Sequence, residues 1–476
     1  MTGSVAQSFE HLDEDAWGTA HERLVDSLGA LIRIRSINQP DPPGAELEAA
    51  RWIAGALEDA GLRPEVFEPF SGRGSVVARL RGDGTGGEPL LLLSHLDVVP
   101  APPAGWTHDP FAGDLAEGYL WGRGAVDMKD LTAMELEVVR LLAEEARRAG
   151  RDPASDPIPG LRRDLLFAST ADEEAGGSQG IGWLVENHPE HLRAAGALNE
   201  SGAVSLTIGE RRLYPIGVAE KGYLVYRISV RGTWGHGSMP RDDNAAVLAA
   251  RVVAALAEPG PVRLTPTMRS FFRGAADALG GDVGRMLRGL AGEDPRAGEA
   301  ALAALCEERH ARVARALLRD TISPDVIHAG IKYNVIPGEA TIELDCRILP
   351  GTSEPQVRAS ILERLGPELA GTCEIELIIS GEPVVAPIDN ELYDVLSATV
   401  RDHDPAGTPL PFMVPFATDA KHLARLGVPS YGFSPLRMDP AESYLERFHG
   451  VDERVSLAAL RWGLPVLYDA VRRFCG

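Results

Sequence analysis

Cysteine is scarce in this sequence, and its four cysteines, Cys306, Cys346, Cys373 and Cys475, form no CxxC pair. Scattered cysteines exclude a zinc knuckle and a disulfide framework, since both need thiols at characteristic spacings. They are typical of reduced thiols, and we therefore expect a cytoplasmic protein.

Long apolar runs and an excess of positive charge are missing as well. No apolar stretch approaches the roughly 20 residues that span a bilayer, and the first residues, MTGSVAQSFEHLDEDAWG, lack the basic start and apolar core of a secretory signal. The formal net charge is -22. This charge disfavours nucleic acids and anionic membranes as partners, because both attract a basic surface. It suits a carboxylate-rich site that holds cations.

The chain has 476 residues, which is too long for one compact core, and no internal repeat is visible. Its first part alternates helical runs with the apolar runs GSVVARL, EPLLLLSHLDVV and RDLLFAST. The second run is so apolar that both faces of the strand should be covered. This alternation predicts an α/β fold, with a mixed, largely parallel sheet and helices on both faces.

From about residue 217 the pattern changes. The run YLVYRISVRG alternates with period two, and the strands ATIELDCRI and CEIELIIS flank the helix EPQVRASILERL. We therefore expect a first domain in two parts, 1–216 and 384–476, with an α+β domain inserted at 217–383. A helical elaboration of the inserted domain is expected at about 264–325.

Acidic residues follow one predicted strand in the stretch STADEEAGG, which holds Glu173 and Glu174. A solvated loop tip is the simplest interpretation of acids before Gly-Gly. In SHLDVVP, His95 and Asp97 are two residues apart at a strand end, so their side chains leave on the same face. A carboxylate beside an imidazole can turn the other ring nitrogen toward a metal, although a lone pair of this kind is more often structural.

Further ligand-type residues lie at the ends of other elements. Asp127 is in the glycine-rich turn GYLWGRGAVDMKD, Glu200 follows a short apolar run in ALNESGAV, and His449 precedes the last helix in ERFHGVDERV. Two histidines and several carboxylates are a donor set that a pair of zinc ions would take.

The ordered motifs SHLDVVP, GYLWGRGAVDMKD, ADEEAGG, LNESGA, GHGSMP, YNVIPGEATIELDCRILPG and FHGVDERV resemble those of the M20 family of di-zinc metallopeptidases and amidohydrolases. That family includes carboxypeptidase G2, carboxypeptidase S, aminoacylase-1 and succinyl-diaminopimelate desuccinylase. The resemblance implies a zinc-dependent hydrolase of an amide bond next to a free carboxylate, either a carboxypeptidase or dipeptidase, or an N-acyl-amino-acid deacylase. A ureido or allantoate-type amidohydrolase and a non-catalytic binding member are the alternatives.

The resemblance also implies two Zn²⁺ per chain, with Co²⁺ or Mn²⁺ as substitutes, and five metal ligands: His95, Asp127, Glu174, Glu200 and His449. Asp127 would bridge both ions, and Asp97 would orient His95. Glu173 would be the general base that generates a metal-bridging hydroxide, which gives the paired glutamates different tasks.

The inserted domain would serve as a lid and dimerisation domain. By resemblance, His236 in GHGSMP donates to the oxyanion, within one chain or across a homodimer, and Asn334 binds polar groups of a small peptide or N-acyl amino acid. Arg347 would clamp a terminal carboxylate, a task that suits a guanidinium fork. The simpler interpretations are a turn histidine and a surface arginine.

One residue departs from the family pattern. Many members follow the bridging aspartate with a second Asp across a cis peptide, whereas this chain has Met128. Four histidines outside these motifs are expected to be ordinary surface residues: His108, His188, His191 and His422.

Overall fold

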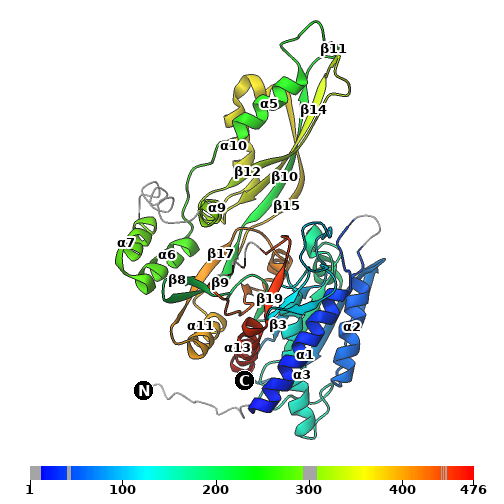
Figure 1. Cartoon of the computed structure of the whole chain (residues 1–476), viewed down its shortest axis with the longest axis vertical. Coiled ribbons are helices and arrows are strands. Elements are labelled where there is room, and N and C mark those ends of the chain that lie inside the picture. The colour runs from blue at the N-terminus through cyan, green and yellow to red at the C-terminus, as the bar shows by residue number, and fades with distance from the viewer. Residues whose placement is uncertain (1–11, 40–43, 293–307, 441, 443, 445–446) are drawn as a thin grey trace. The chain divides into compact units, whose positions relative to one another are not determined.

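The computed structural model describes residues 12–39, 44–292, 308–440, 442, 444 and 447–476. The chain divides into two compact units (Figure 1). Unit 1 comprises Met1–Thr207, Asp389–Gly407 and Arg425–Gly476, and unit 2 comprises Ile208–Ile388 and Thr408–Ala424. Each unit is therefore assembled from segments that are separated in the sequence.

The main sheet of unit 1 has the strand order β1-β2-β6-β3-β7-β18. Its strands are β1 (Glu65–Phe70), β2 (Arg73–Leu80), β3 (Leu90–His95), β6 (Leu165–Thr170), β7 (Gly196–Asn199) and β18 (Ser430–Gly432). β3 is parallel to β6 and β7, and β18 is parallel to β7, whereas β1 and β2 form an antiparallel edge. Every residue of β3, β6 and β7 is buried, as expected for strands covered on both faces. The predicted mixed, largely parallel α/β sheet is confirmed.

Helices cover this sheet and pack on one another. They are α1 (Glu14–Arg33), α2 (Glu46–Asp59), α3 (Lys129–Arg148), α4 (Ile181–Asn187), α11 (Glu391–His403) and α13 (Leu457–Cys475), with the 3-10 turns η1 (Glu173–Ala175) and η2 (Pro189–His191). α1 packs against α3, which also contacts β3 and α13 (Figure 1). The start of α1 is capped by Asp13, whose carboxylate accepts a hydrogen bond from the backbone N–H of Ala16.

A small sheet in unit 1 joins distant parts of the chain. It has the order β19-β5-β4, from β4 (Asp114–Ala116), β5 (Tyr119–Trp121) and β19 (Arg454–Ser456). Because Arg454 pairs with Trp121, the segment that follows His449 lies beside the segment that precedes Asp127.

Unit 2 contains an antiparallel sheet of order β12-β14-β10-β15. Its strands are β10 (Gly222–Arg231), β12 (Thr321–Ala329), β14 (Glu339–Ile348) and β15 (Cys373–Gly381). Alternate residues of β10 are buried, which confirms the period-two prediction. The helices α5 (Ala245–Leu256) and α10 (Glu354–Ala370) pack on the buried face, where Ile228, Ile342 and Val252 belong to one core.

Short elements complete unit 2. β11 (Gly235–His236) pairs with β13 (Val335–Ile336), and β9 (Arg211–Glu220) pairs with β16 (Val384–Val385) and β17 (Gly407–Val414). The helical elaboration contains α6 (Pro266–Leu279), α7 (Gly281–Leu290) and α9 (Glu308–Leu317), and residues 293–307 within it lie outside the described residues. The remaining short elements are α12 (Ala420–Leu423) in unit 2, and β8 (Leu206–Ile208) and η3 (Ala424–Leu426), which each include residues of both units.

Two further observations concern the helices and the cysteines. Among the described helices, none has the length and apolar character needed to cross a membrane. Cys346, Cys373 and Cys475 are free thiols, and Cys306 lies outside the described residues.

Candidate metal centre

Three neighbouring strands of unit 1 end at polar residues. His95 is the last residue of β3, Glu173 and Glu174 follow β6 in η1, and Glu200 follows β7. These strands are parallel neighbours in register, so their carboxyl ends lie at the same edge of the sheet. That edge is where α/β proteins commonly bind ligands.

Two loops bring Asp127 and His449 to the same edge. His95 Nε2 lies 3.3 Å from Asp127 Oδ1 and 3.9 Å from Glu200 Oε1. His449 Nε2 lies 3.2 Å from Asp127 Oδ2 and 3.2 Å from Glu174 Oε2. The structure thus forms two groups of three ligand-type residues, and Asp127 is a member of both groups.

This donor set fits two divalent metal ions. Imidazole nitrogens and carboxylate oxygens are the ligands that zinc takes, and Asp127 offers one oxygen to each group. Within the described residues, His95 Nε2 and Glu174 Oε1 are buried and have no hydrogen-bond partner. A cation in each group would satisfy these atoms and would offset the repulsion among the carboxylates.

Asp97 holds the acidic turn and His95 in place. Its Oδ1 accepts from the backbone N–H of Glu173 at 3.1 Å, and its Oδ2 accepts from that of Glu174 at 3.0 Å and from Asn38 Nδ2 at 2.6 Å. His95 Nδ1 lies 3.0 Å from the carbonyl oxygen of Asp97. Because a carbonyl oxygen only accepts, Nδ1 carries the proton, and Nε2 presents its lone pair to the first ligand group.

The clustered carboxylates shift the pKa values of both histidines. Hydrogen bonds to Asp127 and Glu174 raise the pKa of His449 to about 10. Burial alone would lower the pKa of His95, but the neighbouring carboxylates of Asp127 and Asp97 raise it well above its ordinary value. A metal binds the neutral imidazole, so metal ions and protons compete for these nitrogen atoms.

A buried ion pair that sequence patterns did not indicate fixes the loop before Asp127. Glu453 Oε1 accepts a hydrogen bond from the backbone N–H of Val126 at 2.9 Å, and its other oxygen pairs with Arg123. Arg123 also donates to the carbonyl of Gly450 at 3.0 Å. Burial raises the pKa of Glu453 to about 7, although Arg123 opposes this shift. Both residues lie in the quoted motifs, but no local pattern links groups this far apart in the chain.

Met128, which departs from the family pattern, contacts the centre directly. The Asp127–Met128 peptide bond is cis. The Met128 side chain is buried, and its sulfur lies 3.3 Å from the backbone nitrogen of His95, from which it accepts a hydrogen bond. A thioether therefore supports the end of β3 here.

In unit 2, the structure brings His236 and Asn334 together. The pairing of β11 with β13 makes them neighbours, and the backbone N–H of Gly237 donates to the carbonyl of Asn334 at 2.9 Å. His236 is exposed, and its Nδ1 lies 2.7 Å from Ser238 Oγ.

Arg347 lies far from these two residues within unit 2. β11 and β13 adjoin the Glu339 end of β14, whereas Arg347 is near the opposite end. At about 3.4 Å per residue, the two ends are separated by roughly 25 Å. The Arg347 guanidinium donates from Nε and Nη2 to Asp345 at 2.8 and 3.0 Å. Unit 2 therefore presents Arg347 and His236 at two separate places.

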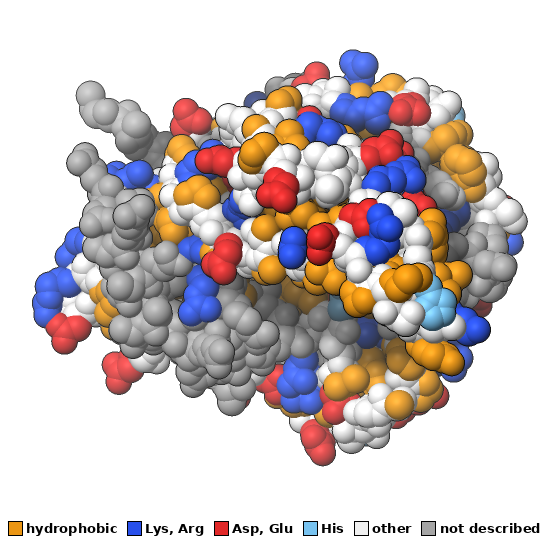
Figure 2. Space-filling model, turned by 90° about the horizontal axis from the view of Figure 1, so that it is seen from above, with side chains coloured by type: hydrophobic (Ala, Val, Ile, Leu, Met, Phe, Trp, Pro, Cys, Tyr) orange, Lys and Arg blue, Asp and Glu red, His pale blue; other side chains and the backbone are white. Residues whose placement is uncertain are grey.

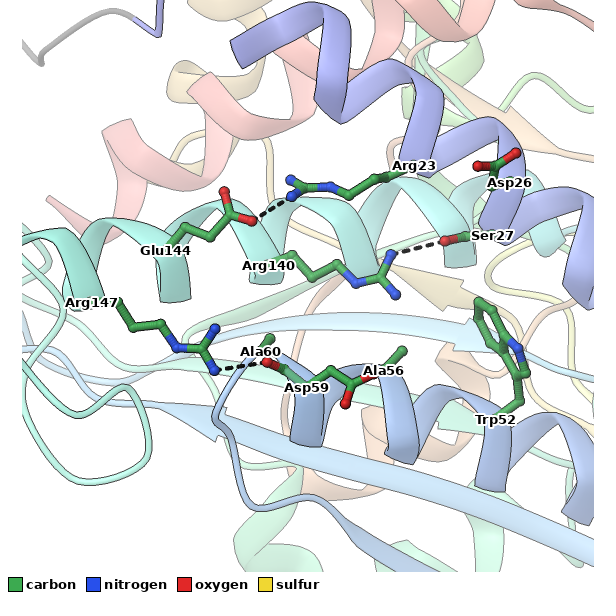
Figure 3. Close-up of a pocket in the computed structure, with 10 residues that line it drawn as sticks. All are labelled: Arg23, Asp26, Ser27, Trp52, Ala56, Asp59, Ala60, Arg140, Glu144 and Arg147. Atoms are coloured by element: carbon green, nitrogen blue, oxygen red, sulfur yellow. Dashed lines mark hydrogen bonds and ion pairs between the residues drawn. The ribbon is translucent and has the colours of Figure 1, made fainter.

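A cleft of about 380 Å³ in unit 1 lies among α1, α2 and α3, away from the ligand groups (Figure 3). Three arginines line it, and each binds a neighbouring group. Arg140 Nη1 donates to Ser27 Oγ at 2.9 Å, and Arg147 Nη2 donates to the carbonyl of Asp59 at 2.8 Å. Arg23 forms an ion pair with a glutamate of α3. These contacts connect the helices, and none of the five expected metal ligands lines the cleft.

Known proteins resemble the chain over most of its length. Residues 91–473 match the model of peptidase family M20/M25/M40. The chain is 26% identical over 454 residues to the N-fatty-acyl-amino acid synthase/hydrolase PM20D1 of Xenopus tropicalis, covering 92% of this chain and 83% of that protein. It is 26% identical over 455 residues to aminoacylase-1 of Sus scrofa, covering 91% of each chain.

A solved structure has a similar fold. The M20 family metallo-carboxypeptidase Sso-CP2 from Sulfolobus solfataricus aligns with a TM-score of 0.67 at 16% identity, covering 97% of this chain and 99% of that one. The chain belongs to peptidase family M20/M25/M40 and is a hydrolase. The family resemblance of the sequence motifs is confirmed.

Replacing Glu453 with Gln should change how stability depends on pH. A carboxyl group with a raised pKa in the folded state contributes stability that is fully present below its ordinary pKa of 4.5 and is lost as the pH rises to about 7. One pKa unit corresponds to about 1.4 kcal/mol, so the metal-free wild type should lose about 3 kcal/mol relative to Glu453→Gln across this range. Urea unfolding of both proteins at several pH values measures the difference. If the free energies of unfolding of the two proteins changed in parallel with pH, the raised pKa of Glu453 would be contradicted.

Proposed function

We propose that the chain is a zinc-dependent hydrolase of a peptide or N-acyl amide bond that lies next to a free carboxylate. The observation that carries this proposal is the pair of ligand groups that share Asp127, with Glu173 beside them. The names of the relatives, an N-fatty-acyl-amino acid hydrolase, an aminoacylase and a carboxypeptidase, support this substrate class. Unit 1 is then the catalytic domain, and unit 2 is the lid and dimerisation domain.

The proposed metal ligands follow the two groups. His95, Asp127 and Glu200 hold one Zn²⁺, and Asp127, Glu174 and His449 hold the other, with Co²⁺ or Mn²⁺ as substitutes. When bound, the ions polarise the scissile carbonyl and lower the pKa of water.

Glu173 and Glu174 divide the remaining work. Glu174 Oε2 lies 3.2 Å from His449 Nε2, so this carboxylate belongs to the ligand group, where a bound cation would keep it ionised. Glu173 takes the proton of the attacking water and later returns it to the leaving amine. The hydrogen bond from its backbone N–H to Asp97 holds this base at a constant position.

Unit 2 supplies the groups that bind substrate. Arg347 binds the free carboxylate with the N–H groups that Asp345 does not use, because a guanidinium has five donors. Asn334 binds a polar group of the substrate. His236 donates a hydrogen bond to the oxyanion that forms on the scissile carbonyl.

The distance between Arg347 and His236 within unit 2 favours a homodimer. A small substrate cannot contact both Arg347 and His236 of one unit 2 across roughly 25 Å, so His236 acts on the substrate of the partner subunit. Large apolar side chains are exposed around the β11 and β13 end, with exposed fractions of 54% for Trp234, 81% for Ile331 and 96% for Tyr333. Figure 2, which views the protein from above, shows apolar side chains interspersed with both signs of charge. Exposed apolar groups of this kind are typical of subunit contacts.

A reducing compartment completes the proposal. The free thiols of Cys346, Cys373 and Cys475 support a cytoplasmic location, because disulfides are rare there.

Glu173→Gln and Glu174→Gln should have different effects. Glu174→Gln should lower metal content, since a neutral amide replaces an anionic ligand, and excess zinc should restore part of the activity. Glu173→Gln should keep about two zinc ions and lower kcat by about 10²- to 10⁴-fold, the usual contribution of a positioned base. Mass spectrometric metal analysis beside steady-state kinetics measures both. Loss of zinc in Glu173→Gln with retention in Glu174→Gln would reverse the two roles.

Amidation of the substrate carboxylate should lower kcat/KM by roughly 10- to 100-fold, which corresponds to a charged hydrogen bond of about 1.5–3 kcal/mol. In Arg347→Ala, acid and amide should be hydrolysed at similar rates, because the group that distinguishes them is gone. Arg227→Ala is the matched control, since Arg227 pairs with Glu343 on the same sheet and should leave the preference unchanged. A wild type that is indifferent to amidation would remove Arg347 from the site.

Mixing inactive His236→Ala and Glu173→Ala proteins should restore part of the activity. Hybrid dimers contain one site with an intact Glu173 from one subunit and an intact His236 from the other. Subunit exchange followed by amine-release assays tests this, with light scattering to measure the oligomeric state. As a control, a mixture of Glu173→Ala and Glu174→Gln should gain nothing, because both changes affect unit 1. A monomeric protein with full activity would rule out the action of His236 at the site of a partner subunit.

A further inference from the structure

A second cluster of ligand-type residues lies in unit 1 at η2. His188 precedes this 3-10 turn and His191 ends it. Residues three apart in a 3-10 turn lie on the same side of the turn, and the backbone N–H of His191 donates to the carbonyl of His188 at 3.2 Å. Pro189 restricts the backbone at the first position of the turn. Both imidazoles, which were expected to be ordinary surface histidines, are thereby brought together.

Carboxylates reach the same place from two elements. The ligand atoms of His188, Glu190 and His191 all lie within 4.8 Å of one another. Glu190 Oε1 is 3.3 Å from His188 Nδ1 and 3.9 Å from His191 Nε2, and Glu65 Oε1, on β1, is 3.7 Å from His191 Nε2. Ligands at about 2.0–2.1 Å from a tetrahedral zinc ion are about 3.4 Å apart. The observed separations are close to what one ion requires.

Aromatic rings pack against the two imidazoles. The ring of Phe67 lies 4.5 Å from that of His188 and 5.6 Å from that of His191, and Trp183 lies 5.2 Å from His188. This packing limits rotation of the imidazoles, so that less freedom is lost when they bind an ion. The side chains of Glu190 and Glu65 are 64% and 62% exposed, which leaves access from solvent.

The charges also favour a cation. Glu190 and Glu65 both approach His191 Nε2, so a cation bound there would have two negative charges beside it.

We propose that His188, Glu190 and His191, with Glu65 as a fourth ligand, bind one zinc ion or a similar divalent transition metal. Two imidazoles and two carboxylates match the ligand preference of zinc. Four protein ligands complete a tetrahedral shell, so the ion has a structural role, as in closed zinc sites. It joins η2 to β1, the edge strand of the sheet. The residues share no member with the two groups at Asp127.

Zinc counting tests this site in the intact protein. At a fixed free zinc concentration sufficient to saturate the wild type, metal analysis should find one ion more per chain in the wild type than in His188→Gln/His191→Gln. The kcat of the double variant should be unchanged, because neither histidine belongs to the proposed catalytic centre. The matched control is His403→Gln: His403 pairs with one carboxylate, Asp469, at 2.7 Å, and its substitution should leave the count unchanged.

Two further measurements make the result decisive. Zinc titration by calorimetry should show binding weakened in Glu65→Gln by at least roughly 10- to 100-fold, the range for loss of a group that only supports a ligand, since Glu65 is itself a proposed ligand. Glu190→Gln changes an exposed side chain without touching the aromatic contacts and should lower the affinity as well. Added zinc should also raise the Tm of the wild type more than that of the double variant.

Equal zinc counts in the wild type and the double variant would overturn the proposal, as would unchanged affinity in Glu190→Gln. If instead the two groups at Asp127 bound no zinc, the zinc count and the activity of all these proteins would be lower than expected. The wild type would still bind one ion more than the double variant.

Discussion

The carboxylate of Asp97 is the contact on which the candidate metal centre depends. It accepts hydrogen bonds from two successive backbone N–H groups, those of Glu173 and Glu174, and its residue also binds His95 Nδ1. Three components of the centre, an imidazole, a ligand carboxylate and the proposed base, are thus positioned by one buried residue. Burial alone would raise the pKa of Asp97, but hydrogen bonding by His95 and Asn38 keeps it lowered, so the carboxylate remains a good acceptor.

Further buried charges hold the loop that carries Asp127. Glu453 and Arg123 are both buried and bind each other and the loop backbone. Lys129, at the start of α3, donates to the carbonyls of Leu31 and Ile34 at 2.8 and 3.0 Å, and burial lowers its pKa to about 7. Buried ion pairs are poor sources of net stability, but removing one partner is costly. Their contacts with the backbone before and after Asp127 fix where this residue lies.

Unit 2 imposes a different constraint, which is length. An antiparallel ladder of ten residue pairs between β10 and β14 makes a stiff element with Arg347 near one end and His236 beyond the other. In the proposed function, this stiffness and distance are the reason for assigning His236 to the site of a partner subunit. Backbone geometry also positions the residues of the proposed zinc site at η2. There, a 3-10 turn places two imidazoles close together, and Glu65 of β1 lies beside them.

The sequence by itself determined the class of fold and the positions of the ligand-type residues, because both depend on local patterns. Apolar runs indicated β3 and β6, and alternation indicated β10. His95 ends a strand that is recognisable from composition, and Glu174 and Glu200 each follow one. Tertiary structure decided which atoms meet. Residues from separate segments meet in three contacts: the Glu453–Arg123 ion pair, the Met128 sulfur with the backbone nitrogen of His95, and the Glu65 carboxylate with His191. Periodicity and turn chemistry describe neighbours along the chain, whereas these contacts arise only when folding closes long loops and buries polar groups that then require partners.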